Sequence, residues 1–104
     1  MKTVTSVNGV LIRLTDERWV HIIQQHPELA LMQDIVLSAI SCPEQVLQGD
    51  RGQLIAVVSI SIDKWLLVIY RELELEGELI DGFIVTAFLN SRKRYMEGKK
   101  QLWP

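Results

Sequence analysis

Both histidines of this chain, His21 and His26, fall within one short segment that is predicted to be helical and to end at Pro27. Histidine is the side chain whose unperturbed pKa lets it accept and donate protons near neutral pH. If His26 lies at the carboxyl end of the helix, the negative end of the helix dipole favours its protonated form. Such an imidazolium could protonate a leaving oxygen or donate to a phosphate. The alternative is that His26 only caps the helix or packs beside Trp19 and Ile23.

The spacing of the two histidines argues against a metal site. Five residues at about 100° each place His21 and His26 about 140° apart around a helix axis, so the pair cannot chelate one ion. The chain has a single cysteine, Cys42, which excludes a thiolate zinc site and an intramolecular disulfide. We therefore expect no metal and no cofactor. His21, on the polar side of the helix, is interpreted as a surface residue.

A second set of candidate residues lies towards the end of the chain. Thr86 is the one polar side chain in the apolar stretch 82–89 of the last predicted strand, and the basic run 92–94 follows it closely. A strand hydroxyl next to such a basic run could bind a phosphate. Arg71 ends the preceding strand, and antiparallel pairing would place it near the start of the last strand, beside Asp81 and Gly82. It could instead pair with Asp81 or Glu72, which would stabilise the protein only modestly.

Length and composition limit the class of protein. With 104 residues, of which 48% are hydrophobic and 23% charged, the chain has the balance of one folded globular domain. No run reaches the ~18–20 apolar residues that a membrane span requires. The first residues also lack the apolar stretch of a secretory signal. We therefore expect a cytoplasmic protein with no membrane partner.

Charge is distributed unevenly along the chain, whose formal net charge is −2. Residues 1–90 carry six basic and twelve acidic side chains, whereas residues 91–104 carry five basic side chains and one acidic one. A basic segment of this kind suits contact with a polyanion, although it could simply keep the C-terminus solvated. The acidic body, by contrast, is unlike the broad basic surface of most nucleic-acid-binding proteins.

The order of predicted elements indicates an α+β protein. A strand at 10–14 precedes a helix that is capped by Thr15 and runs to about Gln25, and a second helix runs from about Glu28 to Pro43. Alternating apolar residues then predict strands at 45–48, 53–62, 65–72 and 79–89. Connections this short require antiparallel neighbours. We expect helices packed on one face of an antiparallel four- to five-stranded sheet, with residues 9–93 as the domain and 94–104 as a basic C-terminal tail.

Taken together, these segments resemble the phage-associated branch of the barnase–EndoU–colicin–RelE (BECR) nuclease-like superfamily. The likeness extends through residues 14–29, which hold both histidines, then 40–46 and 66–71, and it closes with the strand at 82–88. It implies N-terminal helices on a four-stranded antiparallel sheet. In active members it implies metal-independent RNA cleavage, in which the ribose 2′-OH attacks the adjacent phosphorus and a 2′,3′-cyclic phosphate is formed.

The resemblance also implies roles for particular residues, because this reaction needs a base, an acid and donors to the phosphorane. His26 would be the principal acid–base residue, and His21 would assist it. Four residues would contact the nucleic acid: Arg71 by neutralising phosphate charge, Thr86 by donating to a non-bridging oxygen, and Arg92 and Lys93 by holding the RNA backbone.

Two other interpretations remain open on the sequence. The predicted strands at 66–70 and 83–89 are apolar on both faces, and such a sheet is covered on both sides. Helices would cover one face, and a second copy of the chain could cover the other in a homodimer, with Trp65, Tyr70 and Phe88 as the interface aromatics. The protein would then be a catalytically inactive interaction module. Alternatively, it is a toxin whose basic patch is masked by an antitoxin or an immunity-type protein.

Overall fold

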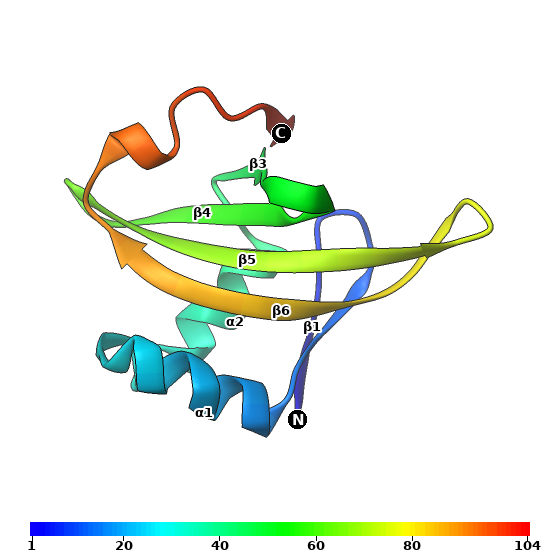
Figure 1. Ribbon diagram of the computed structural model, residues 1–104, viewed down its shortest axis with the longest axis horizontal. Helices are drawn as coiled ribbons and strands as arrows, with labels where there is room; N and C mark the ends of the chain where they lie inside the picture. Colours follow the sequence, from blue (N-terminus) through cyan, green and yellow to red (C-terminus); the bar gives the residue numbers. More distant parts are fainter.

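In the computed structural model, which describes residues 1–104, a strongly twisted seven-stranded sheet carries two α-helices on one of its faces (Figure 1). The α+β class is therefore confirmed, but the predicted number of strands was too low. The helices are α1 (Asp16–Gln25) and α2 (Gln33–Ser41). The strands are β1 (Lys2–Thr5), β2 (Leu11–Leu14), β3 (Gln45–Gln48), β4 (Leu54–Ser61), β5 (Lys64–Leu75), β6 (Glu78–Asn90) and β7 (Gln101–Trp103).

The strands lie in the order β1-β2-β6-β5-β4-β3-β7. The predicted antiparallel meander is present as β3, β4, β5 and β6. One pairing is parallel: β2 runs beside the start of β6, with Ile12 opposite Gly82 and Arg13 opposite Phe83. Sequence patterns of neighbouring strands do not indicate this pairing, because the two strands are separated by both helices and by three other strands.

Two short strands account for the higher strand number. β1 pairs antiparallel with β2, and all but one of its residues are exposed. β7 pairs antiparallel with β3, and the amide of Gln48 donates to the carbonyl of Lys100 at 2.8 Å. Neither strand has enough apolar residues to show the alternation that identifies a strand. The segment that we expected to be a tail therefore contributes a strand to the sheet.

Local signals set the first helix as expected, but not the second. The hydroxyl of Thr15 caps α1 by accepting from the amide of Arg18 at 3.0 Å. The helix ends at Gln25 because Pro27 disfavours helical geometry at the residue before it. The expected start of the second helix near Glu28 was wrong, since Pro27–Leu29 forms a single 3₁₀ turn and α2 begins at Gln33.

Each face of the sheet carries a core cluster. Ile22, Leu29, Val36 and Ile40 of the helical region pack on the first face, against a cluster that includes Tyr70. The smaller second cluster consists of Leu47, Ile55, Val57 and Leu67, and four further hydrophobic side chains pack against it: Trp65, Ile69, Phe88 and Met96. Met96 belongs to the C-terminal segment, which runs over the side of the sheet opposite the helices (Figure 1). The chain itself therefore covers part of its second apolar face.

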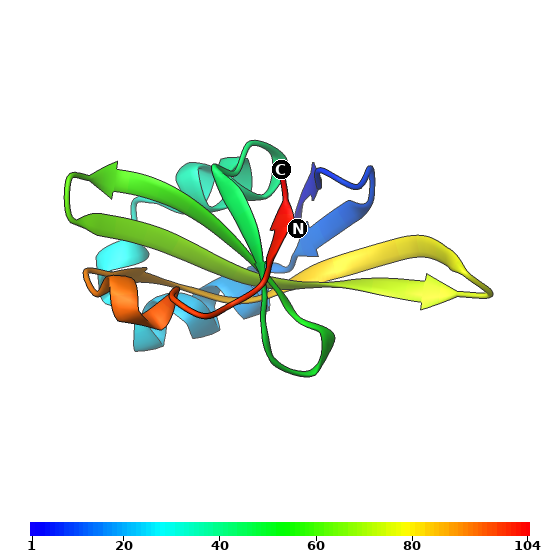
Figure 2. The ribbon, with the colours of Figure 1, turned by 90° about the horizontal axis from the view of Figure 1, so that it is seen from above.

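The hairpin of β5 and β6 extends beyond the rest of the protein in both views (Figures 1 and 2). Near its tip, four large apolar side chains are 41–60% exposed: Leu73, Leu75, Leu79 and Ile80. Neither α-helix of the protein is long enough and apolar enough to cross a bilayer.

Gly82 lies where β2, β5 and β6 meet. A Cβ atom at this position would collide with the carbonyl oxygen of Arg71 and with the Cδ1 atom of Ile12. Ile12 is itself fully buried in the first cluster, so it cannot move aside easily. The close approach of β2 to β6 therefore depends on glycine at position 82.

The buried hydroxyl of Tyr70 leads to the first prediction. Tyr70 is fully buried, and its hydroxyl has no hydrogen-bond partner. Burial, reinforced by the charge of Glu72, raises the pKa of Tyr70 far above its ordinary value. Because an unpaired buried polar group is costly, we expect Tyr70→Phe to raise the free energy of unfolding by about 1 kcal/mol at pH 7, measured by urea denaturation.

The same substitution has a pH signature. Above pH ~10 the unfolded chain releases the Tyr70 proton while the folded chain keeps it, so folding stability falls as pH rises. The wild type should therefore lose more stability between pH 9 and about pH 11 than Tyr70→Phe does. A Tyr70→Phe protein that is destabilised by more than about 1 kcal/mol at pH 7 would contradict the prediction, because the hydroxyl would then have a stabilising partner.

Candidate functional site

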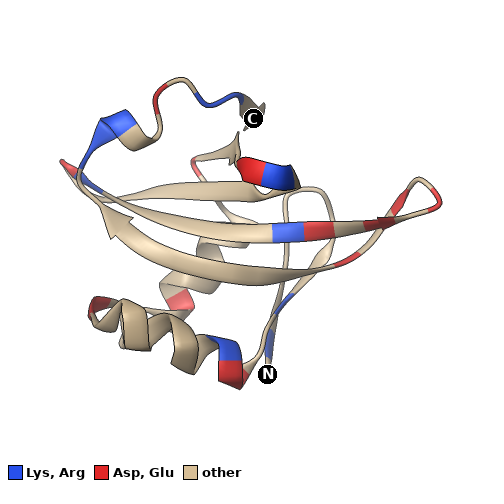
Figure 3. Cartoon of the chain, in the orientation of Figure 1, with Lys and Arg blue, Asp and Glu red and all other residues tan.

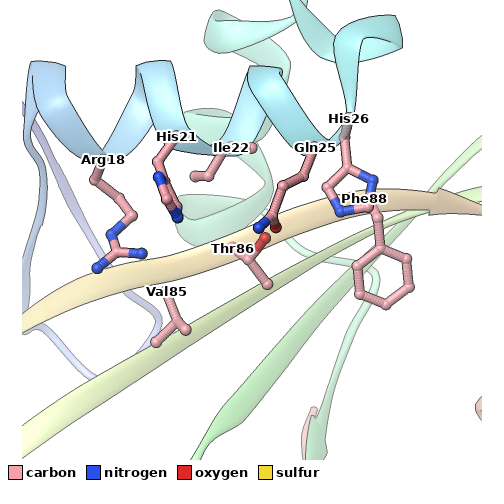
Figure 4. A pocket seen from close by; sticks show the side chains of 8 residues that line it. All are labelled: Arg18, His21, Ile22, Gln25, His26, Val85, Thr86 and Phe88. Carbon is pink, nitrogen blue, oxygen red and sulfur yellow. The ribbon is translucent and has the colours of Figure 1, made fainter.

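A cleft of about 540 Å³ lies between α1 and β6 (Figure 4). β2 pairs only with Gly82 and Phe83 of β6, so β6 continues beyond the end of β2. Beside this continuing part of β6 lies α1 instead of another strand, and the cleft forms between the two. Five lining residues come from the helical segment and three from the strand: Arg18, His21, Ile22, Gln25, His26, Val85, Thr86 and Phe88.

Both histidines line this cleft, although helical spacing alone would separate them by about 140°. The difference arises because His26 is not part of the helix. It is the C-cap residue, with φ −132° and ψ 70°, and its amide still donates to the carbonyl of Ile22 at 2.8 Å. Pro27 imposes this non-helical backbone. The proline that ends α1 thus allows His26 to face the same space as His21.

The ring of His26 has two neighbours. Its Nδ1 atom lies 3.8 Å from the Oε2 atom of Glu28, and its ring centroid is 6.0 Å from that of Phe88. The side chain is 31% exposed, so the ring remains open to solvent. A contact through Nδ1 leaves Nε2 for a ligand. His21 is exposed, as expected of a surface residue, but it also faces the cleft.

Thr86 reaches the cleft with the help of an irregularity in β6. Ile84 pairs with Tyr70 and Thr86 pairs with Ile69, so Val85 is an extra residue without a partner. Such a bulge redirects the side chains around it. Ile84 is buried in the first cluster, whereas Val85 and Thr86 are half-buried and line the cleft.

Arg71 does not line the cleft. Its Nη1 atom donates to the carbonyl oxygen of Arg51 at 2.7 Å, next to the turn that joins β3 to β4. Neither of the partners considered from the sequence binds it, and Asp81 forms an ion pair with Arg13 instead. The arginine in the cleft is Arg18, on α1.

Arg18 and Gln25 were not predicted as site residues, and Phe88 was expected only at a dimer interface. For the first two, a signal was present in the helical spacing. Arg18 precedes His21 by three residues and Gln25 follows it by four, so all three side chains lie on one helix face (Figure 4). For Phe88 there was no such signal, because an aromatic residue in an apolar strand is usually part of the core.

A second hollow of about 400 Å³ adjoins the cleft, and Phe88 lines both. Of the two basic residues predicted to hold a ligand, Arg92 lines this hollow and Lys93 does not. Arg94 and Tyr95 line it as well.

The two adjoining hollows are free of lining carboxylates. Together they have three arginines, Arg18, Arg92 and Arg94, in addition to both histidines. Acidic side chains concentrate instead on the β5–β6 hairpin, at the other end of the long axis of the molecule (Figure 3). The walls of the two hollows thus carry basic side chains, while the carboxylates of Glu17 and Glu28 lie just outside them, beside the histidines.

No three His, Cys, Asp or Glu side chains lie close enough together to hold a metal ion. Comparison of the chain with family models, with curated proteins and with solved structures finds no match. The chemistry of the cleft must therefore be judged from its own residues: two groups able to transfer protons, one guanidinium and one hydroxyl.

Proposed function

We propose that this protein is an endoribonuclease that cleaves RNA without a metal ion, through a 2′,3′-cyclic phosphate. The observation that carries the proposal is the meeting of His21, His26, Thr86 and Arg18 in one open cleft without a carboxylate on its wall. The resemblance to the BECR superfamily is consistent with the same reaction.

Two imidazoles suit the two proton transfers of this reaction. One neutral histidine takes the proton of the 2′-OH as this oxygen attacks phosphorus. The other, protonated, donates a proton to the 5′-oxygen as the bond from phosphorus to that oxygen breaks. His26 is the principal residue of the pair, since its ring lies beside Glu28 and Phe88 and is less exposed than that of His21. His21 lines the same cleft, so a phosphodiester bound there can contact both imidazoles.

Arg18 and Thr86 act on the phosphate itself. A guanidinium offers paired donors to the non-bridging oxygens and balances the charge that develops on the phosphorane. The Thr86 hydroxyl, on the opposite wall of the cleft, donates to one of these oxygens (Figure 4). Arg18 thus takes the role that the resemblance implied for Arg71.

The experiment is cleavage of a mixed-sequence single-stranded RNA in EDTA, with product ends analysed for cyclic phosphate. We expect the wild type to cleave, Thr86→Ser to retain most activity, and Thr86→Val to lose about tenfold or more because it keeps the shape and lacks the donor. Absence of cleavage by the wild type at high enzyme concentration would contradict the proposal. Equal rates for Thr86→Val and Thr86→Ser would remove Thr86 from the mechanism.

A partner-binding module is the second candidate function. It is favoured by the exposed apolar side chains near the tip of the β5–β6 hairpin, since clustered exposed apolar groups commonly mark interaction surfaces. This function requires no cleavage, so the same assay separates the two candidates.

A further inference from the structure

The hollow beside Tyr95 is built from the end of β6 and the turn that follows it. Six residues line it: Phe88, Leu89, Asn90, Arg92, Arg94 and Tyr95. Its volume of about 400 Å³ falls within the range of small-molecule sites. Phe88 also lines the cleft, so the two hollows are neighbours and a ligand in the cleft can extend towards this one.

Three aromatic rings lead from the cleft into the hollow. The His26 and Phe88 centroids are 6.0 Å apart, and those of Phe88 and Tyr95 are 5.5 Å apart with their planes at 88°. The ammonium of Lys99 lies over one face of the Tyr95 ring, 4.7 Å from its centroid, so only the other face could stack a base. These two contacts hold the Tyr95 ring, and yet the residue remains 39% exposed. A held and exposed aromatic ring is the usual platform on which proteins stack a nucleobase.

The backbone around the hollow is braced, so the site exists before a ligand binds. The side chain of Asn90 accepts from the amide of Arg92 at 2.9 Å and donates to its carbonyl at 3.3 Å. The amide of Tyr95 donates to the same carbonyl at 3.2 Å. Neither Arg92 nor Arg94 forms an ion pair within the protein, so both guanidinium groups are free to bind phosphate.

We propose that this hollow is a nucleoside subsite, in which the base next to the cleaved phosphate stacks on Tyr95 while Arg92 and Arg94 bind the following phosphate. The inference rests on the proposed function, because it takes the cleft as the site of the reacting phosphate. It defines the substrate class as single-stranded RNA. In an A-form duplex the bases are paired and stacked on one another, so none is available to the Tyr95 ring.

The test is a binding measurement that does not depend on cleavage. The probe is a fluorescently labelled, mixed-sequence 2′-O-methyl RNA, which has no free 2′-OH and cannot be cleaved by this route. Tyr95→Leu keeps apolar volume and removes the ring, and Tyr95→Phe is the matched control that keeps the ring. We expect Tyr95→Leu to weaken binding about 5- to 100-fold and Tyr95→Phe to remain within about twofold of wild type.

Two further measurements complete the test. A duplex of the same sequence should bind the wild type at least about tenfold more weakly than the single strand. Arg94→Gln should reduce the slope of log affinity against log salt by about 0.7, the value for one phosphate contact on a single strand. Equal affinity of Tyr95→Leu and wild type, or equal affinity for duplex and single strand, would overturn the subsite.

The outcomes keep the subsite and the nuclease apart. If the protein cleaves RNA but Tyr95→Leu binds as tightly as wild type, the proposed subsite is wrong and the proposed nuclease function is supported. Tyr95-dependent binding without cleavage removes the nuclease and supports the hollow as a site for single strands. Tyr95→Leu also loses the ring contacts with Phe88 and Lys99, so a urea denaturation curve must show that the variant is fully folded under the binding conditions before a loss of affinity is assigned to the ring.

Discussion

Replacement of His26 by alanine should lower the rate of RNA cleavage by a factor of about 10² to 10⁴, the usual contribution of a general acid or base. The rate is measured under single-turnover conditions with a short RNA, so that binding and product release do not obscure the chemical step. The loss should exceed that of Thr86→Val, because in the proposed mechanism His26 would transfer a proton whereas Thr86 would only stabilise charge.

The pH profile separates a chemical role of His26 from a structural one. Two histidines in opposite protonation states give a bell-shaped dependence of rate on pH, and His26→Ala should lose one limb of it. His21→Ala is the matched variant and should lose the other limb. If His26 only caps α1, His26→Ala would instead lower stability and leave the shape of the profile unchanged. A rate within threefold of wild type would exclude His26 from the reaction.

Arg18→Ala should slow cleavage about 10²-fold, whereas Arg71→Ala should slow it less than about threefold. The reason is position: Arg18 lines the cleft, while Arg71 donates to the Arg51 carbonyl outside it. The quantity to compare is kcat/KM for one RNA substrate. Arg18→Lys should recover only part of the rate, since an ammonium keeps the charge and loses the paired donors.

The two arginines also serve as controls for each other. Arg71→Ala removes a hydrogen bond and should lower the free energy of unfolding by about 1 kcal/mol, with little effect on catalysis. Arg18→Ala should slow catalysis and leave the free energy of unfolding nearly unchanged. If Arg71→Ala proved the slower enzyme while remaining folded, the phosphate would bind on the side of the sheet where Arg71 lies, and the role implied by the resemblance would stand.

Local patterns in the sequence were sufficient for much of the fold. The Thr15 cap, the helix end before Pro27 and the strand β3 were each predicted within a residue, because each depends on residues adjacent in the chain. β4, β5 and β6 were also found, although β5 continues to Leu75 and so forms the long hairpin. Alternation of apolar and polar residues shows that a strand is present but not where it ends, because the same alternation continues into an exposed hairpin.

The candidate site was only partly predictable. His21, His26 and Thr86 were named from the sequence, and the structure brings them to one cleft together with Arg18. Arg71 was named because strand pairing would bring it near β6. The pairing is real, with Arg71 opposite Phe83, but the guanidinium binds Arg51 instead of entering the cleft. The register of the strands therefore gave the position of the Arg71 backbone but not that of its guanidinium group.

Two errors have the same physical origin. Helical spacing placed His21 and His26 on different sides of the helix, because it assumes helical backbone angles at both residues. Pro27 keeps His26 out of the helix. Regular alternation likewise could not foresee the bulge at Val85, which accompanies the placement of Thr86 in the cleft. At both positions the backbone departs from regular geometry, and departures of this kind are common near functional sites.

The short parallel seam between β2 and β6 has a consequence for the order in which the molecule opens. The two walls of the cleft come from segments about sixty positions apart in the chain, and α1 is joined directly to β2. Only Ile12 and Arg13 of β2 face β6, whereas β5 and β6 are paired along almost their whole length. Local opening favours the region with the fewest backbone hydrogen bonds. The seam can therefore separate while the meander stays paired, and amide hydrogens of β5 can remain protected in molecules whose two histidines no longer face Thr86.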